Sequence, residues 1–459
     1  MPTNDPANDP ANDPANGSGG TPAPAPAPAG RMASARQVLR NPRIWVLPTV
    51  LLGLVSLLLS LVYMGGILDP RGDLHRLPIG LVNADEGAVV AGQPTNLGSR
   101  ITGGIAAAPD PKGQISWRQL DESAAQESLA SGKLYAVLVV RPGFTAAVAS
   151  LGATGQQQAQ RPTMTILTNP GAGSLASSLA TSIAQAAAHA ASLDLGRTLT
   201  AQLPQQGAAA SNAARLQVAD PATIETAVGH PIGTHSGLGL TAFYYTLLLV
   251  LAGFLGGNLI ANGVDVSLGY AASELGPMRT QLPTVPITRT HTLAVTSTMS
   301  VVLALLTSSL IMLACVGILG MDASHLPLLW VFSVCATAAV GLGVQALLAA
   351  FGGIGQLISM FVFIALSLPS SGATVPLQAL PSFYRVLSWF EPMRQLTDGV
   401  RSILYFDARA DAGLTRAWMM IGVGVVAALI FGFAMTTYYD RKGLHRIVPE
   451  HAEEPHPAI

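Results

Sequence analysis

Six long apolar runs, separated by more polar stretches, dominate the pattern along the chain. They are between 18 and 27 residues long, and none contains Asp, Glu, Lys, Arg or His. A helix that rises 1.5 Å per residue needs about 20 apolar residues to cross the hydrocarbon core of a bilayer. The pattern therefore predicts an α-helical polytopic membrane protein with about six transmembrane helices, over residues 44–68, 238–261, 293–319, 326–350, 354–371 and 417–439.

Residues 69–236, between the first and second apolar runs, follow a different pattern. Short alternating or β-branched segments predict strands, and longer segments rich in alanine and serine predict helices. Strands that alternate with helices are typical of an α/β domain. We therefore expect an extracytoplasmic α/β domain between the first and second transmembrane helices, with strands at residues 78–83, 115–120, 134–140 and 162–168 and helices at residues 97–107, after Asp121 and at residues 174–203.

The composition supports a membrane protein. Half of the residues are apolar and 11% are charged, whereas a soluble domain carries about 25% charged residues. Lipid must therefore cover much of the surface. The formal net charge of −1 gives no reason to expect a nucleic-acid partner. Residues 1–43 contain three tandem Asn-Asp-Pro-Ala repeats and a Pro-Ala run, which predict a disordered cytoplasmic tail.

Basic residues beside the apolar runs set the expected orientation, because loops rich in Lys and Arg stay on the cytoplasmic side. Arg31, Arg36, Arg40 and Arg43 precede the first run, and three basic residues follow the last one. Both termini, including the tail of residues 440–459, are therefore expected to be cytoplasmic. Residues 372–416 would then lie outside although they contain five arginines, which opposes this orientation. The abundance of Arg and Ala over Lys is typical of a bacterial genome rich in G and C, so the membrane is expected to be a bacterial plasma membrane.

Residue patterns that carry catalysis are missing from the sequence. It has no Gly-x-x-x-x-Gly-Lys-Ser/Thr loop for a nucleotide phosphate, and no Gly-x-Ser-x-Gly elbow. Its histidines and acidic residues do not have the spacing of metal ligands. Proton-driven pumps usually carry ionisable groups inside the membrane, so the charge-free runs argue against one. We expect a non-catalytic membrane subunit with no cofactor and no bound metal.

Two later segments contain the candidate functional residues. Residues 262–292 form the longest internal cytoplasmic loop. Such a charged loop could transmit motion between two spans, or its arginines could simply anchor the ends of helices. Residues 372–416 form an external segment, and apolar residues recur in it at helical spacing from Arg394 to Phe406. This spacing predicts an amphipathic helix at the outer membrane surface, in a segment that alternatively re-enters the membrane.

Small residues in the second apolar run suggest a packing site. Gly253, Gly256 and Gly257 would permit another helix to approach closely, as at the seam of a dimer. Asn258 and Gln345, which lie in or beside apolar runs, are expected to form hydrogen bonds between helices.

The stretch from Leu77 to Ala88, soon after the first apolar run, resembles the opening of YhgE/Pip domains, in which a strand ends in Val-Asn-x-Asp-x-Gly-Ala. The apolar strand followed by Pro-Gly-Phe at residues 134–144 is similar to the next landmark of that family.

The later half resembles type-2 ABC exporter permeases (ABC-2). The carrying residues are Glu274, Arg279 and the run Pro286-Ile287-Thr288-Arg289 in the cytoplasmic loop, and Leu380-Pro381, Glu391-Pro392-Met393, Arg401 and Tyr405-Phe406 in the external segment. The resemblance implies that residues 237–439 form a five-helix ABC-2-like domain. It also implies a dimer, a coupling loop formed by Glu274, Arg279, Pro286 and Arg289, and an external re-entrant segment with Pro381, Pro392, Arg394 and Arg401.

Two functions follow from this resemblance. In ABC exporters the cytoplasmic loop docks a separate ATPase, so the first is a permease subunit that exports a small hydrophobic, lipid or cell-envelope compound. Some relatives of the YhgE/Pip type are surface receptors or scaffolds of secretion complexes, so the alternative is a non-transporting receptor or scaffold.

Overall fold

The computed structural model describes residues 35, 39–40, 42–90, 92–151, 161–202, 218–444 and 446. The chain divides into two units, residues 1–57 and 58–459, and the second holds nearly all of the described structure. Most of the N-terminal tail expected over residues 1–43 and most of the C-terminal tail expected over residues 440–459 lie outside the described residues.

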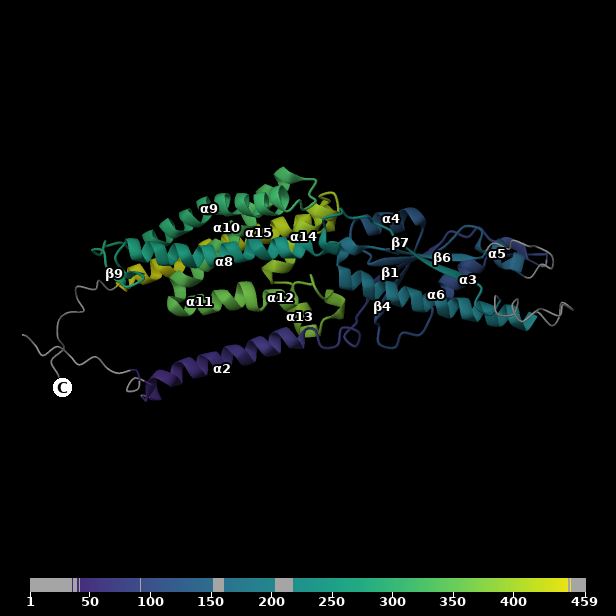
Figure 1. The fold of residues 1–459 in the computed structure, drawn as a ribbon, viewed down its shortest axis with the longest axis horizontal. Helices are drawn as coiled ribbons and strands as arrows, with labels where there is room; N and C mark the ends of the chain where they lie inside the picture. The colour runs from purple at the N-terminus through teal and green to yellow at the C-terminus, as the bar shows by residue number, and fades with distance from the viewer. Residues whose placement is uncertain are drawn as a thin grey trace, which may run out of the picture. The chain divides into compact units, whose positions relative to one another are not determined.

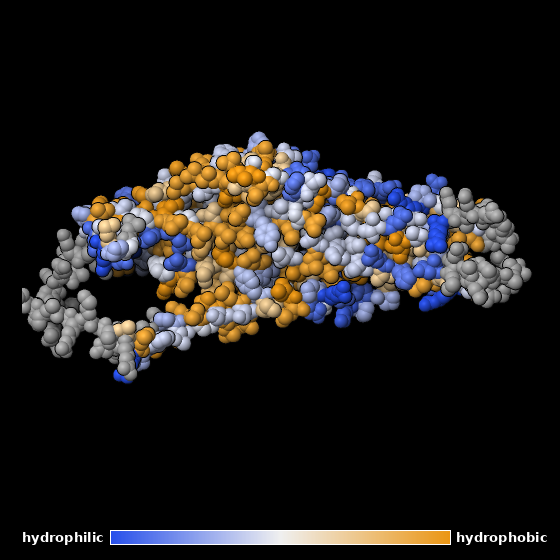
Figure 2. All heavy atoms as spheres, viewed as in Figure 1, coloured by the Kyte–Doolittle hydropathy of each residue, from blue (hydrophilic) through white to orange (hydrophobic). Residues whose placement is uncertain are grey.

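Six candidate membrane-spanning helices occur among the described residues, as the apolar runs predict, and they fit a membrane-embedded protein. Their mean hydropathy is between 1.7 and 2.5. Figure 2 shows apolar side chains spread over the outer surface of the helices, whereas the sheet region is more hydrophilic. The spans are Pro48–Gly65 within α2 (Pro42–Gly65), α8 (Thr241–Ser267), α9 with η4 (Arg289–Met312 and Leu313–Ile318), α10 (Leu326–Phe351), the run α11–η5–α12 (Gly353–Met360, Phe361–Ala365 and Ser367–Ser370), and α15 (Leu414–Arg441).

Three of these helices extend beyond the apolar runs. Asp265 lies in the last turn of α8, Arg289 begins α9, and Arg416 lies in the first turn of α15. These charged groups sit at helix ends, where long side chains can reach water or headgroups. The central parts of the helices stay free of charge.

α10 is the central helix of the bundle, and more than half of its span is buried. It packs against α8, α9 and α15. Gln345 of α10 donates hydrogen bonds to Gly257 O of α8, at 2.9 Å, and to Ser300 Oγ of α9, at 3.4 Å. Gln345 therefore joins three helices, as the sequence suggests. Asn258 instead donates to Phe254 O within α8.

Gly253 and Gly257 are positions where α8 and α10 approach closely. A Cβ atom at Gly253 would lie 2.7 Å from Thr337 O, and one at Gly257 would lie 2.8 Å from a methyl group of Val344. A Cβ atom at Gly256 would meet no atom within 4 Å. Two of the three expected glycines, Gly253 and Gly257, therefore let α8 pack closely against α10 of the same chain.

A five-stranded mixed sheet forms the α/β region, with strand order β4-β1-β5-β6-β7. β1 pairs in parallel with β4 and β5, β5 pairs antiparallel with β6, and β6 pairs in parallel with β7. Four strands match the expected ones, whereas β7 was not predicted, because its alternation is weak and most of its residues are exposed. The bounds are β1 Leu77–Asn83, β4 Ile115–Leu120, β5 Ala136–Val140, β6 Thr163–Thr168 and β7 Thr223–Val228.

Helices cover both faces of this sheet (Figure 1). α3 (Leu97–Ala106), α5 (Phe144–Leu151) and α6 (Ser174–Gln202) pack on one face, against a core that includes Ile79, Leu138 and Ile166. α4 (Glu122–Ala130) packs on the other face, against Val82 and Val137. Successive strand residues point to opposite faces, so β1, buried on both, is apolar almost throughout. Asp121 caps α4 as expected and accepts a hydrogen bond from Ala124 N at 2.6 Å.

Shorter elements complete the chain. A small hairpin, β2 (Ala88–Val90) and β3 (Gln93–Thr95), follows β1, and a second hairpin, β8 (Ser273–Leu275) and β9 (Met278–Thr280), lies between α8 and α9. α13 (Ser382–Leu387) and α14 (Pro392–Tyr405) lie between α12 and α15. The candidate site residues lie in or next to the second hairpin, at the start of α9, and in the segment from Pro381 through α14, apart from the glycines of α8.

Candidate functional site

α14 begins at a buried acidic residue. The Glu391 carboxylate accepts hydrogen bonds from Met393 N and Arg394 N, both at 2.9 Å, and so caps the helix. Glu391 is only 3% exposed. Burial raises the pKa of Glu391 to about 7, although its contact with the Ser367 hydroxyl and its two amide hydrogen bonds oppose the increase. The cap of α14 is therefore a group that can change its charge near neutral pH.

Three further charged residues occupy one side of α14. Asp398 lies between Arg394, at 3.8 Å from its Nε, and Arg401, at 3.9 Å from its Nη1. Arg401 is 7% exposed, its Nη2 donates to Ala373 O at 3.1 Å, and its Nε has no hydrogen-bond partner among the described residues. The pKa of Arg394 lies below its ordinary value, chiefly because the side chain is buried. A network this enclosed is costly unless its groups are paired.

The sequence predicts an amphipathic helix at the membrane surface, and the structure corrects this for α14. α14 packs against α8, α12 and α15, and its residues Leu396, Val400 and Ile403 are buried. Its polar side faces the sheet region across a cavity. The apolar spacing was correctly identified, but protein rather than lipid covers the helix.

A cavity of about 470 Å³ separates the polar side of α14 from the sheet region. Arg394, Asp398 and Arg401 line it from α14, and Arg416 lines it from α15. Lys133 and Tyr135, in the residues that directly precede β5, line it from the sheet region. A hydrogen bond from Tyr135 Oη to Gln378 Oε1, at 3.0 Å, crosses the same junction. The cavity thus brings together charged groups that lie more than 250 residues apart in the chain.

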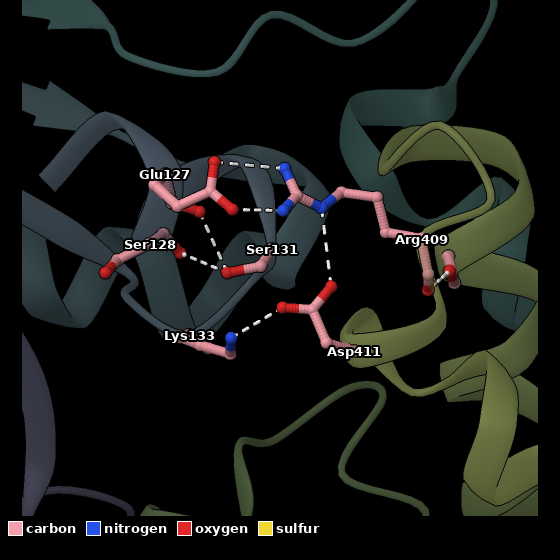
Figure 3. Close-up of polar contacts among 7 residues, drawn as sticks. Glu127, Ser128, Ser131, Lys133, Arg409 and Asp411 are labelled. Carbon is pink, nitrogen blue, oxygen red and sulfur yellow. Dashed lines mark hydrogen bonds and ion pairs between the residues drawn. The ribbon is translucent and has the colours of Figure 1, made fainter. Parts of the chain in front are cut away.

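Ion pairs join the sheet region to the segment before α15 (Figure 3). The guanidinium of Arg409 forms a two-pronged ion pair with Glu127 of α4, and its Nε lies 3.4 Å from Asp411 Oδ1. Asp411 also accepts a hydrogen bond from Lys133 Nζ at 2.6 Å. These contacts hold the pKa of Asp411 below its usual range, chiefly through the hydrogen bond from Lys133. The four residues form a chain of alternating charge across the junction.

His230 and Tyr405 form a second connection on the same side. His230 Nε2 lies 2.7 Å from Tyr405 O, and its ring stacks on Phe406 with centroids 5.5 Å apart. The Tyr405 hydroxyl contacts Thr241, at the start of α8, and accepts a hydrogen bond from Ala242 N at 3.1 Å. The end of α14 is therefore tied both to the sheet region and to the first turn of a span.

The two candidate prolines mark the beginnings of helices. Pro381 precedes α13 as its cap residue, and Pro392 is the first residue of α14. Proline suits such positions because its ring fixes φ and its missing N–H would have had no intrahelical partner. Neither residue contributes a functional group to the cavity.

The coupling-loop candidates separate into two groups. Glu274 and Arg279 face each other across the β8–β9 hairpin, with Arg279 Nε 3.6 Å from Glu274 Oε1, and both side chains are about 70% exposed. Pro286 is exposed beyond the hairpin. Arg289 instead anchors helix ends, because its backbone N donates to Asp440 Oδ1 at 3.0 Å and its Nε donates to Leu444 O at 2.7 Å.

Sequence reasoning missed the residues of the junction. Glu127, Lys133, Arg409 and Asp411 are ordinary surface charges in the sequence, and no local pattern connects residues 127 and 409. Glu391 appeared only as part of a short motif. The available indication was a carboxylate directly before a proline and an apolar helical pattern, which is typical of a helix cap.

Comparisons with known proteins agree with the resemblance to YhgE/Pip domains. A stretch of 121 residues is 29% identical to a protein of Bacillus subtilis (strain 168) named "Uncharacterized protein YhgE", and it covers 26% of this chain and 15% of that protein. No solved structure matches the chain. A family model matches residues 48–424, which include five of the six spans, the sheet region and α14. The chain therefore belongs to the family described as "Protein of unknown function (DUF3533)".

Proposed function

We propose that the chain is an ABC-2-like permease subunit of a bacterial plasma membrane. It would act as a homodimer and export a small hydrophobic, lipid or cell-envelope compound with a separate ATPase. Both termini and the β8–β9 hairpin would be cytoplasmic, and the sheet region would be an extracytoplasmic domain inserted between the first two spans. The chain itself would carry no catalytic group.

The exposed β8–β9 hairpin is the observation that carries this proposal. It projects between two spans, and its Met278 is 68% exposed beside the exposed Glu274–Arg279 pair. Leu282 and Val285, which follow the hairpin, are exposed as well, so several apolar side chains gather at this loop, as on a surface that a partner covers. The segment that leads into the hairpin is tied to the C-terminal segment, because Arg446 lies 2.7 Å from Asp265 at the end of α8 and its guanidinium lies over the Tyr270 ring.

The arrangement of α8 and α15 supports a coupling role. The Tyr405 hydroxyl at the end of α14 binds Ala242 N in the first turn of α8, and Arg409 before α15 pairs with Glu127 of the sheet region. At the other end, the hairpin follows the end of α8, and Asp440 at the end of α15 binds the first turn of α9. The same two helices therefore connect the hairpin with the charged cavity beside α14. Movement at one end could bias contacts at the other through rigid helices.

Co-purification tests the proposal. A tagged full-length chain is extracted in mild detergent from the membranes of its own host, and the proteins bound to it are identified by mass spectrometry. We expect an ATP-binding-cassette subunit at one copy per chain. Arg279→Glu should remove it. Glu274 then faces a like charge, and the hairpin carries two negative charges in place of one of each sign.

Arg100→Glu is the matched control, because Arg100 is an exposed arginine of α3 in the sheet region. It should leave the ATPase bound. Absence of an ATP-binding-cassette subunit from the unmodified preparation would contradict the permease function. Equal loss in both variants would contradict docking at the hairpin while leaving the permease function standing.

A cavity in the sheet region favours the alternative of a receptor or scaffold. It has a volume of about 1100 Å³, and Ile101, Trp117, Ile183 and Leu195 are among its lining residues. A pocket of this size, mostly apolar with a few polar groups, is typical of a binding site. If a secretion component or an external protein co-purifies in place of an ATPase, the receptor or scaffold function is supported instead.

A further inference from the structure

A second, smaller pocket beside α14 has a strongly basic lining. It has a volume of about 260 Å³, and four arginines line it from four parts of the chain: Arg76 before β1, Arg385 in α13, Arg394 in α14 and Arg416 in α15. Trp389 lines it as well. No Asp or Glu is found among the described residues that line it. We refer to it as the arginine pocket.

Most of this positive charge is not neutralised by the protein. Arg394 is 3.8 Å from Asp398, and its Nη1 donates to Ser388 O and Oγ. Within the part of the chain that the structure describes, no carboxylate lies within ion-pair distance of Arg76, Arg385 or Arg416. Guanidinium groups keep their charge at any physiological pH, so their mutual repulsion favours an anion in the pocket.

Trp389 holds one of these arginines at the edge of the pocket. The Arg416 guanidinium lies over the Trp389 ring, with Cζ 5.5 Å from the ring centroid. This cation–π contact orients the guanidinium without consuming its N–H groups. Those N–H groups remain suited to a two-pronged hydrogen bond with a phosphate.

Exposed apolar side chains lie directly next to the arginine pocket. Phe383, Val386, Trp389 and Phe390 are between 60% and 78% exposed, although they fall within eight consecutive residues. Four large apolar side chains in water would be an unfavourable patch. We call this group the α13 patch. A ligand of the arginine pocket that also carries hydrocarbon would cover it.

Two observations place the pocket at the level where spans end. Tyr384 Oη, in α13, donates to Val62 O at 2.9 Å, one turn before the end of the span Pro48–Gly65. Arg416 lies in the first turn of the span α15. Aromatic residues and arginines collect at this level in membrane proteins, because headgroups and acyl chains meet there.

We propose that the arginine pocket binds the phosphate of an anionic phospholipid, such as phosphatidylglycerol, from the membrane leaflet next to the sheet region. The acyl chains lie along the α13 patch. Binding here joins the ends of α13, α14 and α15 to the segment before β1. The proposal requires membrane embedding alone and stands whether or not the chain transports a compound.

Free phosphate and a second protein copy are weaker occupants. Free phosphate would satisfy the arginines but leave the α13 patch in contact with water. A second copy would cover the patch. It would also have to place a carboxylate in the arginine pocket, because the same pocket in the second copy is positively charged and would repel it. A phospholipid satisfies both parts at once.

Native mass spectrometry of the full-length chain in detergent tests the proposal. Delipidated protein is titrated with phosphatidylglycerol, with phosphatidylcholine of the same chains, and with inorganic phosphate. We expect one tightly held phosphatidylglycerol per chain and at least about tenfold weaker binding of phosphatidylcholine. Replacing two arginines by Arg385→Gln with Arg416→Gln should weaken phosphatidylglycerol binding about tenfold or more, since each arginine beside an anionic lipid contributes severalfold.

Control variants separate this effect from damage to the fold. Arg100→Gln with Arg118→Gln removes two exposed arginines of the sheet region and should leave lipid binding unchanged. Arg385→Lys with Arg416→Lys keeps the charge but not the two-pronged hydrogen bond, so its binding should fall between those of the unmodified chain and the double glutamine variant. If the double glutamine variant does not fold, Arg416→Gln alone should still weaken binding about fivefold.

Four outcomes would overturn the proposal. The first three are equal binding of the two lipids, equal loss in the sheet-region control, and binding of inorganic phosphate in place of phosphatidylglycerol. A dimer that holds no lipid and is broken by Phe383→Ala with Phe390→Ala would likewise show that a second copy covers the α13 patch.

Discussion

Arg409, in the segment before α15, forms a two-pronged ion pair with Glu127 of α4, and the two residues lie 282 positions apart in the chain. One of the two contacts, from Nη1 to Oε2, measures 3.2 Å. The pair joins a helix of the sheet region to the entrance of a span. The contacts beside the cavity therefore depend on charges from distant parts of the sequence.

Breaking this pair should loosen the junction without unfolding either part. In Arg409→Glu, hydrogen exchange should rise at the backbone amides of α4 and of residues 131–135, because Glu127 then faces a like charge. Exchange measured by mass spectrometry in detergent checks this. The charge-reversed double variant Glu127→Arg with Arg409→Glu should recover part of the protection. Exchange that stays unchanged in the single variant would show that the pair does not hold the junction.

Glu391 should make stability depend on pH in a defined direction. Its pKa is about 7 in the folded chain and about 4.5 in its ordinary state, so between these values the folded chain binds more protons. The free energy of unfolding should therefore fall as pH rises from about 4.5 to about 7, by about 3 kcal/mol at most, and level off above.

Glu391→Gln should remove this dependence, because glutamine cannot ionise. Compared with the unmodified chain, the variant should gain stability steadily between pH 4.5 and pH 7, on top of a constant loss from its weaker helix cap. Denaturant unfolding in detergent across this range provides the measurement. Glu274→Gln, at an exposed carboxylate of the hairpin, is the control and should show no such trend. A difference between Glu391→Gln and the unmodified chain that is independent of pH would sink the idea.

Gly253 and Gly256 provide a matched pair within one helix. Gly253→Ala places a methyl group against the α10 backbone, whereas Gly256→Ala places it in open space. We expect Gly253→Ala to lower the free energy of unfolding by about 1–3 kcal/mol through overpacking. Gly256→Ala should leave it unchanged or raise it by up to about 1 kcal/mol, because alanine favours a helix. Equal effects in detergent would contradict the close contact of α8 with α10.

Asp440 should stabilise the start of α9. Its carboxylate accepts hydrogen bonds from Arg289 N and Thr290 N, both at 3.0 Å, and from Thr290 Oγ1 at 2.7 Å. Asp440→Ala should therefore cost about 1–2 kcal/mol, as the loss of a helix cap does. Asp440→Asn keeps one acceptor oxygen and should cost less. Thermal unfolding of both variants in detergent checks the order, and an alanine variant as stable as the asparagine variant would argue against capping.

The contacts of Arg289 change how the coupling loop should be tested. Because Arg289 binds Leu444 O, and its backbone N binds Asp440, a substitution there disturbs the helix ends even if no partner docks. Glu274 and Arg279 have exposed side chains and pair only with each other among the described residues. Variants of the hairpin therefore test docking, whereas variants of Arg289 test the bundle.

The sequence by itself determined the features that depend on neighbours in the chain. Uninterrupted apolar runs specify the six spans, since only a helix satisfies its own backbone hydrogen bonds in lipid. The alternation at β4, the apolar β1 and β5, and the Asp121 cap of α4 likewise follow from local side-chain placement and hydrogen bonding. The exposed β7 lacked such a pattern and was missed.

Tertiary structure alone decided what surrounds these elements. The spacing from Arg394 to Phe406 predicts an amphipathic helix equally well on a membrane surface or inside a protein, because periodicity does not reveal whether lipid or protein covers the apolar side. The contact of Glu127 with Arg409, and the convergence of Arg76, Arg385 and Arg416, depend on how distant segments pack. Charge–charge attraction acts through space, so its partners are fixed only once the chain has folded.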